Sequence, residues 1–514
     1  MRLHDVGRYI GRAALLFAAG ILVASCGGSD KDGQAGAARV RFAFALPTSW
    51  DPVTSRTGAD INTISLAYAS LTRLDKDGNA EPSLAETWSY SPDGKALTFQ
   101  LRKGLTFTDG TPLDSAAVKA FFDRGLTQAD SFLKSDLGGV ESVSVDGPLT
   151  VTFHLKEPDY QLPYVFAGRV GAIASPAAAR KDAKKLALWP VGAGPFRIVE
   201  FVPESHAYFE KNPGYWDAAN IHIDRLELTN QPDQSTLIAA LQSGSIDVAA
   251  RVAPRRIQEA KDRGLTVLEA PSLNAADVSI NRNRPPFDNP KVVEALRYAF
   301  DRAEIIKTVA VGHAAPTHQP FPPGHFAFNP EVEKLWNYDP ARTKALLKAA
   351  GYAPGALSVE IAVNPILNDG VPELVQAQLQ RVGIKSKLRI VPPGSSTWQS
   401  EVYIAKRPAI AIDGTIGRES PVQNLLATYG PQGIMNLSGP YASPAFLAAI
   451  DTVRRTPVDD PAYRARLHEA VRIGVEQSPT NYILSTPWSV IARPRIRNLN
   501  VLPSQIRWEG VTVQ

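Results

Sequence analysis

The sequence predicts an α/β body in which strands and helices alternate along the chain. Alternating apolar runs bounded by turn residues occur within 39–155, which is typical of strands and hairpins. Apolar stripes at helical spacing occur within 237–350. The chain beyond about residue 40 is long enough for two or three domains, and it contains no clear internal repeat.

The strands are predicted from alternation and turn chemistry. The first is 39–46, RVRFAFAL, which alternates like a half-buried strand. A hairpin turns at 91–94, SPDG, and its second strand places apolar side chains at alternate positions of 97–101. Another hairpin turns at 146–148, DGP, before the alternating strand 149–155.

Helices are predicted from apolar spacing and end signals. Asp114 can cap a helix whose apolar face includes 118–122. Further stripes lie at 237–241 and 292–300. Within 339–351, Asp and Pro stand at the start of a short helix and Gly stands at its end.

The N-terminus has the features of a secretory signal. Arg2, Arg8 and Arg12 give a positive start, and the apolar run 13–24 is shorter than the roughly 20 residues that span a membrane. It ends in VASCG, which resembles a bacterial lipobox around Cys26. This resemblance implies cleavage before Cys26 and lipid attachment to its thiol.

Cys26 is the only cysteine, so an exported chain has no intramolecular disulfide and a lone thiol would be a liability. A lipid attachment point explains both facts; an ordinary cleaved signal with a chance cysteine is the alternative. We therefore expect a lipoprotein signal peptide at 1–25 and a flexible, glycine-rich tether at 26–39.

Charge and motifs exclude several classes of function. The formal net charge of +4 falls to about +2 without the first 25 residues, which contain three Arg and one Asp. No basic stripe indicates nucleic-acid binding, and no Walker loop, nucleophile elbow or zincin helix is present. His313, His318 and His325 are a weak metal candidate, because no carboxylate or thiol stands at ligand spacing beside them. We expect no metal, no cofactor and no enzyme activity.

Several tracts resemble the extracellular solute-binding proteins of family 5, the oligopeptide-, dipeptide- and nickel-binding subunits of ABC importers. Together they span about 40–500 in the family's order and spacing. The tracts are PSLAETW at 82–88, DG at 93–94, LRKG at 101–104, DGTP at 109–112, GAGPF at 192–196, KNPGYW at 211–216, ALQSGSID at 240–247, PFD at 286–288 and ALRYA at 295–299. Most of these residues set turns or fill a core, so Glu86, Arg102 and Asp109 are interpreted as structural charges.

The resemblance implies a two-lobed periplasmic-binding-protein fold of cluster C type, class II-like, with a subdomain inserted in the N-terminal lobe. Lobe I would comprise 40–70, 189–273 and 487–514, with the inserted subdomain at 71–188 and lobe II at 274–486. It also implies a monomer that closes on a peptide or other small polar solute by a hinge motion and delivers it to ABC permease and ATPase subunits. The expected location is periplasmic or otherwise extracytoplasmic, at a membrane through the lipid anchor.

The resemblance also implies where the solute binds. Peptide-binding relatives have a Trp-x-x-Asp pattern in lobe II, whose aspartate pairs with the free amino group of the peptide. The preferred alignment places Arg418 where that aspartate would be, with Asp413 or Glu419 as replacements if the loop shifts, and Thr415 lies between them. A guanidinium prefers carboxylate, phosphate or sulfate over an ammonium.

Trp398 matches a family position that flanks the ligand, and the alternative for it is a core aromatic. For Arg418 the alternative is a surface pair with Glu419. The sequence therefore predicts a ligand other than an ordinary peptide held by its N-terminus: an acidic or modified peptide, or another polar solute such as an organic acid, an oligosaccharide or a nickel complex. An exported hydrolase and a ligand-sensing or adhesive surface protein remain as rival interpretations.

Overall fold

The computed structural model describes residues 37–56, 60–231, 233–364, 367, 370–392, 395–439, 442–503 and 505–514, without the side chains of 395, 396, 415 and 416. Cys26, the predicted signal peptide and most of the predicted tether lie outside these residues. Residues Ala38–Gln514 form one compact unit.

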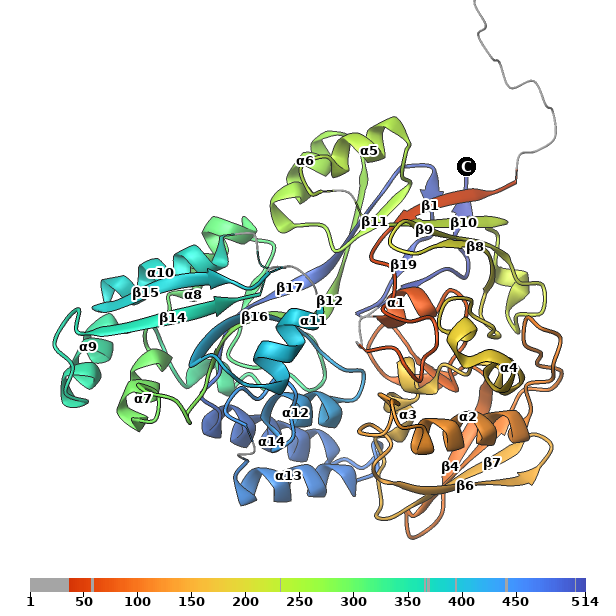
Figure 1. The fold of residues 1–514 in the computed structure, drawn as a ribbon, viewed down its shortest axis with the longest axis horizontal. Coiled ribbons are helices and arrows are strands. Elements are labelled where there is room, and N and C mark those ends of the chain that lie inside the picture. The colour runs from red at the N-terminus through yellow and green to blue at the C-terminus, as the bar shows by residue number, and fades with distance from the viewer. Residues whose placement is uncertain are drawn as a thin grey trace, which may run out of the picture. The chain divides into compact units, whose positions relative to one another are not determined.

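The main feature of this unit is an 11-stranded mixed sheet among the described residues (Figure 1). Its strands lie in the order β15 (Ile384–Ile390), β14 (Leu357–Val363), β16 (Ile410–Ile416), β12 (Thr266–Ile280), β17 (Asn481–Ala492), β11 (Val248–Ala250), β1 (Arg39–Ala43), β10 (Arg225–Thr229), β9 (His206–Lys211) and β8 (Phe196–Val202), while β13 (Ala315–Pro316) pairs with β17. We call β11, β1, β10, β9 and β8 the first half of the sheet and β15, β14 and β16 the second half.

The two halves are joined by β12 and β17, the longest strands (Figure 1). The start of β12 pairs with the end of β17 beside β11, and its later part pairs with β16 on the other side. The register shifts between Ala270 and Asn274, and Asn274 then faces Thr486. The predicted lobe boundaries 273/274 and 486/487 therefore fall inside these two crossing strands.

Helices pack beside each half of the sheet. The second half carries α7 (Pro290–Arg297), α8 (Arg302–Ile305), α9 (Pro340–Ala349) and α10 (Val371–Arg381), and a three-helix group next to it contains α12 (Pro421–Tyr429), α13 (Pro444–Arg454) and α14 (Tyr463–Gln477). The first half carries α5 (Leu237–Ser243) and α6 (Ile257–Asp262), and α11 (Ser395–Trp398) precedes β16.

A second sheet lies within the predicted subdomain. It has the order β4 (Ala85–Tyr90), β5 (Ala96–Leu101), β7 (Thr150–Leu155) and β6 (Val140–Gly147), and α2 (Ser115–Thr127) packs against it. Also in this region are β2 (Thr72–Leu74), β3 (Ala80–Pro82), α3 (Leu162–Val165) and α4 (Pro176–Leu186). The remaining elements are α1 (Ile61–Ile64) and the short pairs β18 (Ile496–Arg497) with β21 (Thr512–Val513) and β19 (Asn500–Val501) with β20 (Ile506–Arg507).

Local sequence signals explain many of these elements. Both predicted hairpins form, and the Asp114 side chain accepts a hydrogen bond from the Ala117 backbone N–H at the start of α2. Asp339 caps α9 in the same way, and Gly351 after α9 has a φ of +92°, in the left-handed region that favours glycine. The α/β prediction is confirmed, and the predicted strand 39–46 is shorter, since β1 ends at Ala43.

Candidate functional site

A cavity of about 170 Å³ lies where the crossing strands leave the first half of the sheet. Its described lining comes from Gln234, from residues 251–254, 274–276, 484 and 486–487, and from Leu367 and Gly414. Residues on both sides of the crossing strands therefore contribute to it. Two larger hollows of about 570 Å³ are lined by residues within 285–409 alone. Because both sides line it, a movement of the two halves would change the shape of the 170 Å³ cavity.

Arg251 is the charged residue among the described residues that line this cavity. It directly follows β11 and has a φ of +54°, in the left-handed region that residues other than glycine rarely adopt. Its side chain is half-buried, and burial lowers the pKa of its guanidinium. No carboxylate of the described residues lies within ion-pair distance of it.

Polar side chains from three other segments line the same cavity: Gln234, Asn274 and Thr486. The Gln234 Oε1 atom accepts a hydrogen bond of 2.9 Å from the Ala253 backbone N–H, which leaves the Gln234 amide N–H groups for other partners. Asn274 and Thr486 face each other across β12 and β17. The cavity thus combines one cation, several neutral polar groups and an apolar remainder, which is a common composition of small-molecule sites.

Asp413, a predicted site residue, lies next to the cavity in β16 but is buried, 3% exposed. Its carboxylate accepts hydrogen bonds of 2.7 Å from Asn364 Nδ2 and from the Tyr403 hydroxyl. It faces Asp277 of β12 directly across the ladder, and Ser279 donates a bond of 2.6 Å to Asp277. Burial, and then the Asp413 charge, raise the pKa of Asp277 well above its ordinary value; burial also raises the pKa of Asp413. The two carboxyl groups form a coupled buried pair.

Trp398 and Thr415 also lie near this pair in the chain. Trp398 is 4% exposed and packs in a cluster with Val391, Val402 and Ala411, while its ring lies 6.3 Å from that of Tyr403. Thr415 pairs through its backbone with Ala275 of β12, and its side chain is outside the described residues. The geometry of Trp398 is that of a core aromatic, and the cavity lining among the described residues does not include it.

Arg418 and Glu419 lie in a different place, in a charge cluster with residues of the predicted subdomain. Arg169 is 5% exposed and lies 3.4 Å from Asp136, through Nη2 and Oδ2. Burial lowers the pKa of Arg169, as does the Arg418 charge, while burial raises the pKa of Glu419. A Cβ atom at Gly168 would lie 2.5 Å from Glu419 Oε2, so the Glu419 carboxylate contacts the backbone at a position where only glycine leaves room.

Further polar contacts join the same two regions. The Gln423 side chain donates a 2.6 Å hydrogen bond to Asp136, and Arg454 contacts Asp159 at 2.6 Å. Gln161 accepts from the Tyr463 hydroxyl at 3.2 Å. We call the following residues the closing contacts: Asp136, Asp159, Gln161, Gly168, Arg169, Glu419, Gln423, Arg454 and Tyr463. The predicted residues are therefore separated: Asp413 lies in the buried pair, Trp398 in an apolar cluster, Thr415 in the β16 ladder, and Arg418 and Glu419 beside Arg169.

The three histidines of the metal candidate, His313, His318 and His325, lie in separate environments. The His313 Nδ1 atom lies 3.3 Å from Glu269, burial lowers the pKa of His318 to about 3, and burial lowers the pKa of His325 to about 4. His325 stacks against Phe321 and Phe326. Within the described ranges, no group of three or more His, Cys, Asp or Glu residues is arranged to bind a metal.

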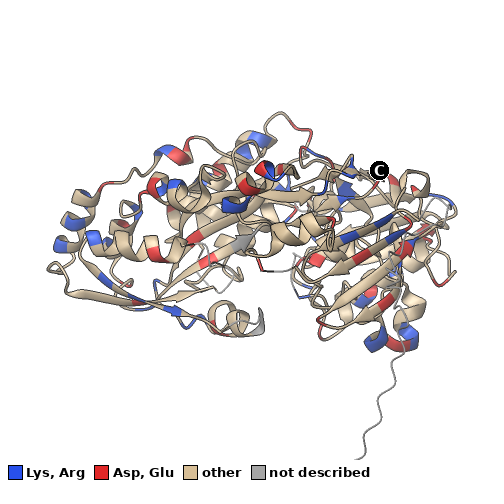
Figure 2. Cartoon of the chain, turned by 90° about the horizontal axis from the view of Figure 1, so that it is seen from above, with Lys and Arg blue, Asp and Glu red and all other residues tan. Residues whose placement is uncertain are grey.

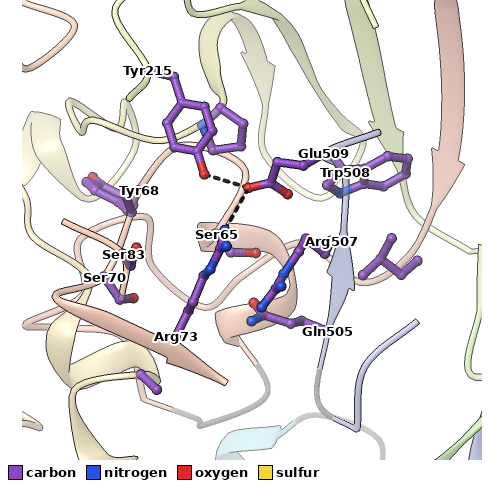
Figure 3. A pocket seen from close by; sticks show the side chains of 14 residues that line it. Ser65, Tyr68, Ser70, Arg73, Ser83, Tyr215, Gln505, Arg507, Trp508 and Glu509 are labelled. Atoms are coloured by element: carbon purple, nitrogen blue, oxygen red, sulfur yellow. Dashed lines mark hydrogen bonds and ion pairs between the residues drawn. The ribbon is translucent and has the colours of Figure 1, made fainter. Parts of the chain in front are cut away.

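A smaller cavity of about 60 Å³ lies between β2, β20 and the residues around Tyr215 (Figure 3). The Tyr215 hydroxyl donates a 2.5 Å hydrogen bond to Glu509, whose carboxylate lies 3.6 Å from Arg73. Arg73 and Arg507 both contact Glu81, at 2.8 and 2.9 Å. The guanidinium groups of Arg73 and Arg507 are thus paired with the carboxylates of Glu81 and Glu509, and the volume suits a few waters. The cavity at Arg251 differs, because no carboxylate of the described residues pairs with that guanidinium.

Arg251, Asp277 and Arg169 were not predicted from the sequence. A signal for Arg251 existed, because it is a lone cation directly after the apolar run 248–250. For Asp277 and Arg169 the sequence carried no signal, since their neighbours Asp413 and Glu419 are far away in the chain.

In the cartoon of Figure 2, basic and acidic residues are mixed over helices and strands. Among the residues that the structure describes, no helix is long and apolar enough to cross a membrane.

Comparisons with known proteins identify the family. A model described as "Bacterial extracellular solute-binding proteins, family 5 Middle" matches residues 79–436, more than half of the chain. The glutathione-binding protein GsiB of Salmonella paratyphi A is 32% identical over 337 residues, which cover 65% of this chain and 65% of that protein. The chain thus matches just under two thirds of the length of that relative.

Solved structures agree in fold. The periplasmic binding protein DppA from Helicobacter pylori, in complex with the peptide STSA, superposes with a TM-score of 0.82 at 23% identity, covering 92% of this chain and 98% of that one. AgaA from A. tumefacien R10, in complex with agropinic acid, gives a TM-score of 0.80 at 23% identity, with 93% and 99% covered. The two-lobed architecture predicted from the motifs is confirmed, and this chain belongs to the bacterial extracellular solute-binding proteins of family 5.

Proposed function

We propose that this chain is the extracytoplasmic solute-binding lipoprotein of an ABC importer, which captures a peptide or peptide-like solute between two lobes and delivers it to a membrane permease. The observation that carries this proposal is the 170 Å³ cavity, which is lined from both sides of the crossing strands. A cavity in that position changes its shape when the two sides move, so a bound solute can stabilise one arrangement over the other.

The proposed division of the chain follows from the crossing strands. Lobe I comprises 40–70, 189–273 and 487–514, the inserted subdomain comprises 71–188, and lobe II comprises 274–486. The closing contacts then join the subdomain to lobe II, and the hinge lies in β12 and β17 near Asn274 and Thr486. Closure of this kind presents the loaded protein to its permease.

The GsiB relative binds glutathione, as its name states, and this supports a peptide-like ligand. That relative is a binding protein, and we propose that this chain likewise breaks no bond and needs no cofactor. Energy would come from separate ATPase subunits. We propose a monomer, in accord with the single compact unit formed by residues 38–514.

The proposed anchor is a lipid on Cys26, with the signal peptide 1–25 removed and the tether 26–39 left between membrane and binding unit. A tethered binder stays close to its permease, which raises their effective concentration. The test is Cys26→Ala, which should move the protein from the membrane fraction to the soluble extracytoplasmic fraction. Retention of the variant in the membrane fraction would show that something other than the thiol anchors it.

Trp398, Asp413, Thr415, Arg418 and Glu419 remain predicted ligand residues. Arg418 and Glu419 lie at the closing contacts, where they can act on affinity through closure as well as through direct contact. Arg418→Ala distinguishes the two effects. If Arg418 contacts the ligand, the variant should lose affinity for acidic peptides more than for neutral ones; if it acts through closure, it should weaken both equally.

The proposal is tested by identifying the ligand. Protein starting at residue 27, which contains the entire compact unit 38–514, is purified and its copurified solute is identified by mass spectrometry. Calorimetry then compares glutathione, a mixed library of di- to pentapeptides, and an agropinic-acid-like organic acid. Binding of a peptide or peptide-like solute at a 1:1 ratio is the expected result. Binding of the organic acid alone would favour the non-peptide alternative, and hydrolysis of a bound peptide would overturn the proposal.

A further inference from the structure

We infer that Arg251 is an anion-binding residue of the cavity and that the solute carries a carboxylate that this guanidinium receives. The inference rests on the proposed function, because it assigns the chemistry of the ligand to the same cavity. It concerns a residue in lobe I, whereas the residues predicted from the family pattern all lie in lobe II.

The charge balance of the cavity lining indicates an anionic ligand group. Arg251 is the charged residue in the described lining, and the other polar groups there, Gln234, Asn274 and Thr486, are neutral. A half-buried guanidinium without a counter-ion is costly, and burial lowers the pKa of this group. In the 60 Å³ cavity, by contrast, Arg73 is matched by two carboxylates. A ligand carboxylate would supply the charge that the cavity lining lacks.

The backbone conformation of Arg251 also supports a role for its side chain. Arg251 has a φ of +54°, and a left-handed residue that is not glycine, asparagine or aspartate is unfavourable. The conformation turns the chain away directly after β11, where Val252 donates a backbone hydrogen bond of 3.3 Å to the Ser489 carbonyl of β17. Glycine would adopt this turn more readily, so the presence of arginine indicates that its side chain has a use at this position.

The size of the cavity and the hydrogen-bond donors in its lining suit a carboxylate group. A cavity of about 170 Å³ exceeds the roughly 150 Å³ that admits benzene in an engineered cavity. It is too small for a drug-sized molecule. It therefore suits the carboxylate end or an acidic side chain of a solute. A guanidinium receives such a group through two parallel hydrogen bonds, and the amide groups of Gln234 and Asn274 can donate to the same oxygens.

The carboxylate can come from the C-terminus of a peptide, from an acidic side chain or from a non-peptide organic acid. The experiment separates these sources with four probes: a library of free-acid di- to tetrapeptides of neutral residues, the same library with amidated C-termini, glutathione, and citrate. Affinity is measured by calorimetry on the full chain in mild detergent.

Three substitutions are compared with the wild type. Arg251→Gln removes the charge, and Arg251→Gly removes the side chain while relieving the left-handed backbone, so it should fold at least as well as the wild type. Arg255→Gln is the matched control, because Arg255 is an exposed arginine four residues away and is outside the cavity lining.

The wild type should bind at least one carboxylate probe about tenfold or more tightly than its uncharged counterpart, and both Arg251 variants should lose that preference. Preference for the free-acid over the amidated library identifies a C-terminus, binding of glutathione alone identifies an acidic peptide, and binding of citrate alone identifies an organic acid. Arg255→Gln should behave as the wild type.

Equal binding of free-acid and amidated peptides, unchanged in Arg251→Gln, would overturn this inference and leave solute binding intact. A wild type that binds none of the probes would overturn both.

Discussion

Two regions join the proposed lobes, and they do so by different means. At the crossing strands, β17 lies between β11 and β12 with continuous backbone pairing, and its side chains Val490 and Ile491 are fully buried. At the closing contacts, the subdomain meets lobe II through polar pairs such as Arg454 with Asp159 and Gln423 with Asp136.

The difference shows which region can open. Separating β17 from its neighbours exposes apolar surface and breaks a ladder, which amounts to local unfolding. A partly exposed polar pair such as Arg454 with Asp159 exchanges protein partners for water at a cost of about 1 kcal/mol or less. We therefore expect the crossing strands to act as the permanent connection and the closing contacts as the reversible one.

The largest effect should come from breaking the permanent connection. Ile491→Ala removes a side chain at 0% exposure from the core beside β11, and truncation of this kind costs about 2 to 5 kcal/mol of unfolding free energy. Urea unfolding monitored by circular dichroism measures it. Ile491→Val is the control and should cost about 0.5 to 1.5 kcal/mol. A loss below that of the control would show that the crossing strands contribute less than their burial indicates.

The buried pair beside the crossing strands should show the next largest effect, with pH dependence. The folded pKa of Asp277 lies above its ordinary value of 3.8, so the folded state retains a proton that the unfolded chain has lost. The contribution of Asp277 to stability is therefore fully present at low pH and is lost as pH rises through its raised pKa. Asp277→Asn removes this dependence and should stabilise the protein by about 1 to 3 kcal/mol at pH 8.

Thermal unfolding between pH 4 and pH 8 measures this difference. The control Asp262→Asn, at an exposed position of α6, should leave the pH profile unchanged. If the stability of Asp277→Asn changes with pH in parallel with that of the wild type, Asp277 does not retain a proton in the folded state.

A moderate effect on affinity should follow from disturbing the reversible connection. Gly168→Ala places a Cβ atom 2.5 Å from Glu419 Oε2, so the carboxylate must move and the closed arrangement is weakened. Affinity for the copurified solute should fall severalfold. Gly138→Ala, whose Cβ would meet its nearest neighbour at 3.6 Å, is the matched control. Equal behaviour of the two variants would show that Glu419 does not support closure.

The smallest effect is expected for one polar pair alone. Arg454→Ala and Asp159→Ala each remove one side of a 2.6 Å contact that is partly exposed. A double-mutant cycle should give a coupling of about 1 kcal/mol or less, and added salt should reduce it. A coupling of several kcal/mol would mean that opening is more costly than the comparison implies.

Much of the local structure was predictable because its causes are local. The turns at 91–94 and 146–148 and the caps at Asp114 and Asp339 are set by neighbouring residues, and the structure contains each of them. The family, and with it the two-lobed fold, followed from motifs that serve the scaffold.

The candidate site was less predictable because its causes are not local. Asp413 was predicted as a ligand residue from its place in the chain, yet its environment is set by Asp277, 136 residues earlier, through strand pairing. Arg251 was overlooked because the turn that directs it, and the cavity that surrounds it, arise only when β11, β12 and β17 come together.

The sequence by itself determined the α/β class and the family, since turn residues, apolar periodicity and short motifs carry that information directly, and it predicts an export signal with lipid attachment at Cys26. Only the tertiary structure decided which charges are compensated. Asp277 meets Asp413, Arg169 meets Asp136, and no carboxylate of the described residues lies within ion-pair distance of Arg251, because electrostatic balance depends on distances between segments that the linear order does not specify.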